Sequence, residues 1–354
     1  MAEVAREERR HPRLYKATGD LVISAISEDV THIFRVHAVV IAEHSPVFSG
    51  MLSLPVEDAA AQKYDGVPIV HLPDNAKDVG ALLEYLYTLE SSVLNAAGRT
   101  WAAEAYALMA IANKYQVDSV CTALTNCLKA QWPTTLVEFI EAKTRKPPSE
   151  LFYSEAAQSP REPASAIRLA TDFNIPEVLP SAYYELAMHD ITTGSTNLIR
   201  WNLLRPEELL RYYQGKRRLE RRFAFSAAVY DPPNLQEWCE TLFSDYDWYE
   251  GDPRESSVCR REMASAKKKW EGKFGDSITN FEAMRRADPI QAILEIYEED
   301  KNNVKFCALC SNDFRTDCRR AIERVWGSLP AAFSLVRVFI SAVITVSLVL
   351  PVYL

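Results

Sequence analysis

Alternating apolar and polar positions predict a small β-sheet near the start of the chain. Residues 20–26 are rich in aliphatic side chains, and residues 31–37 alternate between apolar and polar positions, as a half-buried strand does. The acidic pair at 28–29 separates the two runs and predicts a turn. Residues 67–72 form a third run of this kind, so we expect three strands in all.

A second periodicity, with apolar residues three and four positions apart, predicts helices after the first two strands. Residues 39–42 make one apolar turn, and Ser45 followed by Pro46 is typical of a helix start. Pro suits the first helical position because the N–H that it lacks would have no partner there. Phe48 begins the apolar face of this helix. Further amphipathic helices are predicted at residues 79–88, 101–112 and 117–128.

The order of these elements predicts an α+β domain in which a helical cluster caps a small β-sheet. Four prolines from 147 to 163 mark a break. Helical periodicity resumes at 167, so a mostly α-helical domain follows. We divide the chain into an N-terminal arm (1–17), the α+β domain (18–130), a linker or long loop (131–165), a helical C-terminal domain (166–330) and an apolar tail (331–354).

Part of the first helical cluster recurs at an offset of 58 residues. Both copies predict a helix, a tight turn at an aromatic-x-aliphatic unit and a second helix. The matched pairs are Met109 and Ile167, Ala112 and Ala170, Tyr115 and Phe173, Val117 and Ile175, Val120 and Val178, and Leu128 and Leu186. Later helices are predicted at residues 207–229, 257–273, 289–299 and 316–329.

The composition is that of a globular protein, and it is useful mainly because it excludes other classes of protein. With 48% hydrophobic and 25% charged residues the chain can form a core, which excludes wholesale disorder. A net charge of −8 argues against a protein whose main task is to bind nucleic acid. Residues 1–10 lack the apolar run of a secretory signal, and the 7 cysteines are odd in number. We therefore expect a cytoplasmic or nuclear protein with reduced thiols.

The last 17 residues, 338–354, carry no charge. A helix of this length spans about 25 Å, against a hydrocarbon core of about 30 Å. Three interpretations stay open: a C-terminal membrane anchor, a terminal helix or strand buried in the protein, and an incorrectly predicted end of the gene. The short length and Pro351 weigh against the anchor.

Five short motifs, taken in order, resemble those of the BTB/POZ domain family. They are Gly-Asp-Leu-Val-Ile at 19–23, Phe-Arg-Val-His-Ala-Val-Val at 34–40, Ser-Pro-Val-Phe at 45–48, Leu-Pro-Asp at 72–74 and Leu-Leu-Glu-Tyr-Leu-Tyr-Thr at 82–88. Each motif alone is weak, but their order and spacing are specific. The resemblance covers about a third of the chain. The residues that it marks as fold-defining, and not as catalysts, are Asp20, Phe34, His37, Ser45 and Phe48.

This resemblance implies a protein-binding role. BTB domains form homodimers or pair with other BTB domains, some dock onto Cullin-3 as substrate adaptors of ubiquitin ligases, and others recruit transcriptional partners. In the zinc-finger-linked branch an Arg commonly follows the motif His; here Ala38 stands at that position, so the charged pocket that Asp20 would share is incomplete. We expect an adaptor that dimerises or docks onto a scaffold, with a nuclear transcription regulator as the alternative.

The remainder of the chain resembles, more loosely, the C-terminal region of BTB proteins that are numerous in filamentous and mushroom-forming fungi. The matching segments are residues 166–176, 288–289, 307–310 and 325–330. The resemblance implies a helical region without an assigned activity, and the apolar tail lies outside it.

The sequence lacks the common motifs of catalysis. It has no Gly-rich phosphate-binding loop, no nucleophile elbow and no His-Glu-x-x-His metal site. No motif places a nucleophile beside His37, so we predict that this side chain makes a buried hydrogen bond at a strand-to-helix junction. The chain is predicted not to be an enzyme; a zinc-dependent enzyme in its C-terminal half is the remaining alternative.

The cysteines suggest one candidate cofactor, a structural zinc ion. Cys307 and Cys310 have the spacing of half a tetrahedral zinc knuckle, and thiolates suit zinc. Cys239 and Cys259 are predicted to complete the site, and Cys259 with Cys318 is the other pairing left open. The competing interpretation is a set of small buried thiols that pack as apolar side chains.

The basic run at 216–222 also has two interpretations. It suits a nuclear localisation signal or a phosphate-binding patch, but it also suits the solvated face of a helix. Glu220 interrupts the run and favours the helix face.

Overall fold

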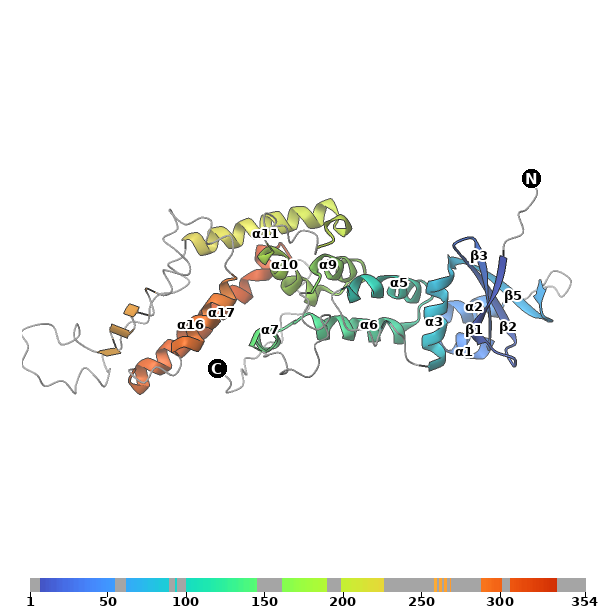
Figure 1. The fold of residues 1–354 in the computed structure, drawn as a ribbon, viewed down its shortest axis with the longest axis horizontal. Helices are drawn as coiled ribbons and strands as arrows, with labels where there is room; N and C mark the ends of the chain where they lie inside the picture. Colours follow the sequence, from blue (N-terminus) through green and yellow to red (C-terminus); the bar gives the residue numbers. More distant parts are fainter. Residues whose placement is uncertain are drawn as a thin grey trace, which may run out of the picture. The chain divides into compact units, whose positions relative to one another are not determined.

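The computed structural model describes residues 7–54, 62–88, 93, 100–144, 161–189, 199–225, 258–259, 261–262, 264–265, 268, 288–300 and 306–335. The chain divides into two compact units (Figure 1). The first comprises Met1–Gln131 and Pro148–Phe173, and the second comprises Trp132–Pro147 and Asn174–Leu354.

The strands belong to the first unit and form one sheet in the order β1-β3-β2-β5-β4 (Figure 1). The central strand β2 pairs antiparallel with β3 and parallel with β5. On the outside, β1 runs parallel to β3 and β4 runs antiparallel to β5. The strand bounds are Glu7–Tyr15 for β1, Leu21–Ser27 for β2, Val30–Val36 for β3, Lys63–Tyr64 for β4 and Val67–Asn75 for β5.

The turn between β2 and β3 lies at Glu28 and Asp29, which confirms the predicted turn. Both residues have positive φ, 52° and 61°, and they connect the paired residues Ser27 and Val30. A two-residue turn of this kind has a twist that matches the twist of the strands. Asp tolerates positive φ better than most residues do, and this helps to place the turn here.

The first strand, β1, is an element that the hydrophobic pattern does not predict, within the stretch expected to be an N-terminal arm. Only Leu14 of this strand is buried, so apolar alternation is missing. The sheet curls so that its two edge strands, β1 and β4, come close to each other. Arg10 of β1 forms an ion pair of 2.8 Å with Asp65, directly after β4, and Tyr64 of β4 donates a hydrogen bond of 3.2 Å to Glu8 of β1. Charged side chains along an edge strand also disfavour pairing with another chain.

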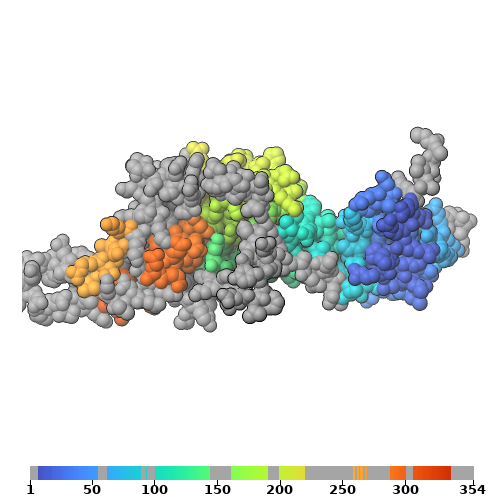
Figure 2. Space-filling model, viewed as in Figure 1, coloured from blue at the N-terminus to red at the C-terminus, as the bar shows by residue number. Residues whose placement is uncertain are grey.

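Helices pack against the curled sheet and close the core of the first unit. On the face seen in Figure 2 the strands β1 to β3, in dark blue, lie beside light blue residues of the segment that includes β5 and α3. Val22 and Phe34 of the sheet are fully buried, and Leu82 and Leu83 of α3 are buried with them. The helices described in this unit are α1 (Ala38–His44), α2 (Pro46–Leu52), α3 (Ala76–Thr88), α5 (Trp101–Lys114), α6 (Asp118–Gln131) and α9 (Pro163–Asp172).

All regular elements described in the second unit are helices. This arrangement confirms the predicted fold class, an α+β domain followed by a helical region. One of these helices, α7, lies in the stretch expected to be a linker, and it buries Phe139 and Ile140. The elements are α7 (Leu136–Thr144), η1 (Pro176–Val178), α10 (Leu179–Met188), η3 (Trp201–Leu203), α11 (Pro206–Phe225), α16 (Pro289–Asp300) and α17 (Ala308–Ala332).

The repeat at an offset of 58 residues has a structural counterpart in two local turns. α5 ends at Lys114 and α9 ends at Asp172, which is the same offset. Gln116 and Asn174 then adopt nearly the same positive φ, 53° and 54°. The recurrence of a left-handed residue after each helix supports a common local plan for the two segments.

Candidate functional site

The junction between β3 and α1 holds two of the predicted motif residues, Asp20 and His37. The Asp20 carboxylate accepts a hydrogen bond of 2.7 Å from the Ala38 N–H, a group at the start of α1 that lacks a helical partner. Gly19 precedes it because a Cβ there would lie 2.8 Å from the Val36 carbonyl oxygen. Asp20 therefore serves the backbone of this junction.

His37 is half-buried and uses both ring nitrogens. Its backbone N–H donates to the Tyr87 hydroxyl at 2.7 Å, and the same hydroxyl lies 2.9 Å from Nδ1. Nε2 lies 3.0 Å from Thr18 Oγ1, so each ring nitrogen has a hydroxyl partner. Burial raises the pKa of Tyr87. The ring thus connects the end of β3, α3 and the turn between β1 and β2, and its contacts are structural.

Ser45 and Phe48 join α2 to the end of α5. Ser45 Oγ accepts from the Phe48 N–H at 3.1 Å, as an N-cap does, and donates to the Tyr115 carbonyl at 2.5 Å. The Phe48 and Tyr115 rings stack with centroids 4.4 Å apart. Burial, with the hydrogen bond to Asp74, raises the pKa of Tyr115 well above its usual value. Phe34, the remaining motif residue, lies in the core against Gly80 of α3.

A serine and a histidine that are distant in the sequence become neighbours on the sheet, because β2 pairs with β5. No sequence motif predicts this pair. Ser24 Oγ lies 2.5 Å from His71 Nδ1, and His71 Nε2 lies 2.8 Å from Gln62 Oε1. Ser24 is only 3% exposed and the third group is an amide in place of a carboxylate. This geometry suits strand cohesion between β2 and β5, because a nucleophile must be reachable by its substrate.

Among the described residues of the first unit, the most exposed large apolar side chain, Val39, lies on α1. Val39 is 68% exposed, although it lies within the uncharged run Ala38-Val39-Val40-Ile41-Ala42. Ile41 of the same helix is fully buried, so the first turn of α1 is apolar on both its inner and its outer side, and the exposed Glu43 follows one turn after Val39. A helix that is apolar all round is normally covered on all sides. We call the outer side, formed by Val39 and the half-exposed Val40, the α1 surface.

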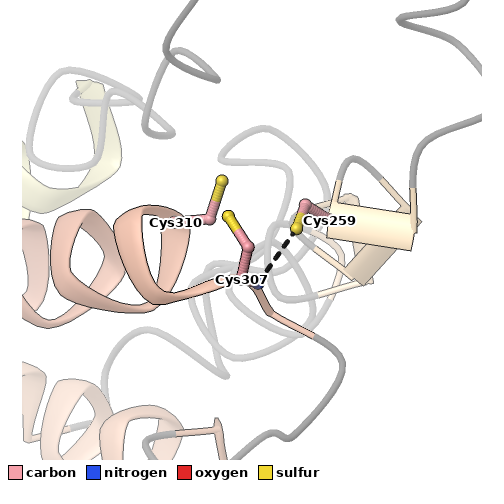
Figure 3. Close-up of side chains that lie close together, drawn as sticks. All are labelled: Cys259, Cys307 and Cys310. Atoms are coloured by element: carbon pink, nitrogen blue, oxygen red, sulfur yellow. Dashed lines mark hydrogen bonds between the residues drawn. The ribbon is translucent and has the colours of Figure 1, made fainter. Parts of the chain in front are cut away.

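Three of the cysteines predicted as metal ligands lie together in the second unit (Figure 3). The ligand atoms of Cys259, Cys307 and Cys310 are all within 4.8 Å of one another. Cys239 lies outside the described residues. Cys318 is buried eight residues beyond Cys310 on α17, about 12 Å along the helix, and does not belong to this group.

The described part of the basic run contacts other helices of the second unit. Arg218 donates to the Ala332 carbonyl and to Ser334 Oγ, both at 2.7 Å, and so caps the end of α17. Lys216 donates to the His189 carbonyl that follows α10 at 3.5 Å and lies over the Tyr212 ring of its own helix, 5.9 Å from the centroid. These contacts stabilise helix packing and account for two of the basic side chains without nucleic acid.

Among the described residues, no helix has the length and apolar character that crossing a bilayer requires. The tail at 338–354, where an anchor is one interpretation, lies outside the described residues.

Comparison with known proteins bears on the first unit. The model of the BTB/POZ domain family matches residues 13–131. No curated protein matches the chain. The fungal resemblance of the C-terminal region and the proposed domain boundaries therefore stay predictions. From the matched residues, the curled sheet and the helices that cap it, we conclude that this chain carries a BTB/POZ domain, a protein–protein interaction module, followed by a helical region.

Proposed function

We propose that this protein is a non-enzymatic adaptor whose BTB domain binds a second copy of itself through the α1 surface. The observation that carries the proposal is the exposure of Val39 in a helix that is also apolar on its buried side. Covering such a surface removes apolar area from water, which is the main driving force of association. The helical region would then select a further protein partner.

A second copy is the occupant that we favour because the uncharged first turn of α1 is complementary to itself, and an antiparallel pairing centred on Val39 keeps the exposed Glu43 of each copy one turn away from the two-fold axis. Two-fold symmetry would bring the α1 surface of each copy against that of the other, as isologous interfaces require. No charged side chain precedes Glu43 in α1, so this pairing brings no like charges together over its first five residues. A heterodimer with another BTB domain would use the same chemistry.

Within this proposal, the finer function is that of a substrate adaptor for a Cullin-3 ubiquitin ligase. Its support is the BTB domain together with a second compact unit made of helices, which in this proposal would hold the substrate. The alternative is a nuclear transcription regulator that recruits partners through the BTB domain. The alternative has less support, because Arg218 of the basic run binds the end of α17 and Lys216 lies within hydrogen-bond distance of the carbonyl that follows α10.

A charge in the α1 surface tests the dimer. Val39→Asp leaves the core intact because Val39 is exposed, but it would bury an unpaired carboxylate in the interface. Such a charge costs more than about 1.4 kcal/mol, so we expect the dimer dissociation constant to rise at least about ten-fold. Analytical ultracentrifugation over a concentration series measures this constant.

The matched control is Leu210→Asp, which places the same charge on an apolar residue of α11 that is 56% exposed. We expect this variant to dimerise like the unmodified chain. A monomeric unmodified chain at tens of micromolar, or equal weakening by both variants, would contradict the dimer. Calorimetric titration with purified Cullin-3 then tests the ligase assignment, and absence of binding by the intact dimer would count against it.

A further inference from the structure

The sequence places two thiols at the start of the longest described helix. Cys307 is the N-cap of α17, with φ −67° and ψ 164°, and Cys310 lies in the first turn. A separation of three residues on a helix brings two side chains onto the same side. Both thiols therefore lie at the positive end of the helix dipole, where a thiolate is favoured over a thiol.

A third thiol reaches this point from a distant part of the chain. Cys259 lies in a helical segment 48 residues earlier, and its Sγ accepts a hydrogen bond of 3.2 Å from the Cys307 N–H. Figure 3 shows the three sulfur atoms beside the first turn of α17. Backbone N–H groups that donate to cysteine sulfur stabilise the thiolate, and such outer bonds orient the ligands of metal sites.

Burial makes a cation necessary if these groups ionise together. Cys259 and Cys310 are buried, and Cys307 is half-buried. Phe306, directly before Cys307, and Phe314, one turn after Cys310, are buried and stack with centroids 5.7 Å apart. Three thiolates this close would repel one another in a low dielectric, whereas a bound divalent cation offsets both the repulsion and the cost of burial.

We propose that Cys259, Cys307 and Cys310 bind one zinc ion, which joins the segment around Cys259 to the first turn of α17. Zinc prefers sulfur ligands at about 2.3 Å, so the sulfurs of a tetrahedral site are about 3.8 Å apart. The present separations, all within 4.8 Å, need shifts of only about 1 Å. Each thiol gives its proton to solvent as the Zn–S bond forms. Magnesium and calcium are disfavoured because they select oxygen ligands.

Metal analysis of the full chain tests the proposal directly. The protein is purified with a phosphine reductant and without added metal, and its metals are measured by plasma mass spectrometry. We expect about one zinc per chain and at least a roughly five-fold loss in each of Cys259→Ser, Cys307→Ser and Cys310→Ser. Cys318→Ser is the matched control, a buried cysteine on α17 outside the group, and keeps its zinc.

Cobalt provides a readout that does not depend on how well the variants fold. Chelated unmodified protein titrated with Co²⁺ is expected to show tetrahedral d–d bands and sulfur-to-cobalt charge transfer, and zinc should displace them. Chelation should lower the thermal midpoint of the helical region, and added zinc should restore it. Purified protein without zinc, iron in place of zinc, zinc kept by the three variants, or cobalt bands without charge transfer would each overturn the site.

Discussion

At the scale of single residues, the polar side chains of the BTB motifs bond to backbone groups. Asp20 accepts from the Ala38 N–H, and Ser45 both accepts from the Phe48 N–H and donates to the Tyr115 carbonyl. Groups at helix ends lack helical partners, so a short polar side chain at each end satisfies them. The polar residues of the family motifs thus stabilise the junctions between strands and helices. For this reason the motifs do not identify the binding partner.

Removal of the His37 ring should therefore lower the free energy of unfolding of the BTB domain. His37→Ala leaves the Tyr87 hydroxyl without its bond to Nδ1 and Thr18 without its bond to Nε2. We expect the free energy of unfolding to fall by about 1–3 kcal/mol, measured by urea denaturation. The control is Lys77→Ala, whose ion pair with Glu28 is exposed on both sides, so its loss should leave the free energy of unfolding within experimental error of the unmodified chain. Equal stability of His37→Ala and the unmodified chain would exclude this role.

At the scale of elements, the sequence predicts those turns and helix ends whose position depends on the residues within them. Glu28-Asp29 and Ser45-Pro46 are correctly predicted as a turn and a helix start, because positive φ and N-capping depend on the residues themselves. β1 is missed because an edge strand needs no apolar alternation, and its pairing with β3 is set by the rest of the sheet. The long uncharged α1 run predicts a helix, but only the structure shows that Val39 faces outward.

The thiol group shows the same limit at the candidate site. The spacing of Cys307 and Cys310 is readable in the sequence, and one helical turn makes them neighbours. The choice between Cys239, Cys259 and Cys318 as companions depends on packing between segments far apart in the chain. The structure brings Cys259 to the pair and leaves Cys318 further along α17, which local spacing could not decide.

In the second unit, a charged group joins α7, α10 and α16. Lys143 lies 3.3 Å from Glu185 and 3.0 Å from Asp288. Burial alone would lower the pKa of Lys143, but the two carboxylates raise it above its usual value. We expect Lys143→Met to lower the free energy of unfolding by about 1–3 kcal/mol, because two partly buried carboxylates then face each other without a cation.

A double-mutant cycle separates this charge effect from lost packing. Glu185→Gln removes one of the two carboxylates, so adding it to Lys143→Met should recover about 0.5–1 kcal/mol. Urea denaturation of the four proteins gives the coupling energy. Strict additivity of the two changes would mean that the ion pairs contribute nothing and that Lys143 acts through its aliphatic chain alone.

At the scale of the whole molecule, each compact unit has its own buried core and its own buried polar group. The first is built around Phe34 and the Ser45 junction. In the second, the Tyr184 hydroxyl donates to Asp288 and accepts from the Ile290 N–H at 3.2 Å. Burial, with the Asp288 carboxylate, raises the pKa of Tyr184 well above its usual value, so this hydroxyl stays protonated and keeps its bond.

Two matched variants should consequently increase local opening in different units. Ser45→Ala leaves the Phe48 N–H and the Tyr115 carbonyl without their buried partner, and Tyr184→Phe does the same to Asp288 and Ile290. Each loss costs about 1–3 kcal/mol, which speeds amide exchange through local opening about five- to 150-fold. Hydrogen-exchange mass spectrometry should find the faster peptides of Ser45→Ala in α2 and α5, and those of Tyr184→Phe in α10 and α16. Local opening spreads through a cooperative core. Faster exchange of both the β2 and the α16 peptides in each variant would therefore mean that the two cores unfold together. That result would contradict the division into an interaction domain and a separate partner-selecting region.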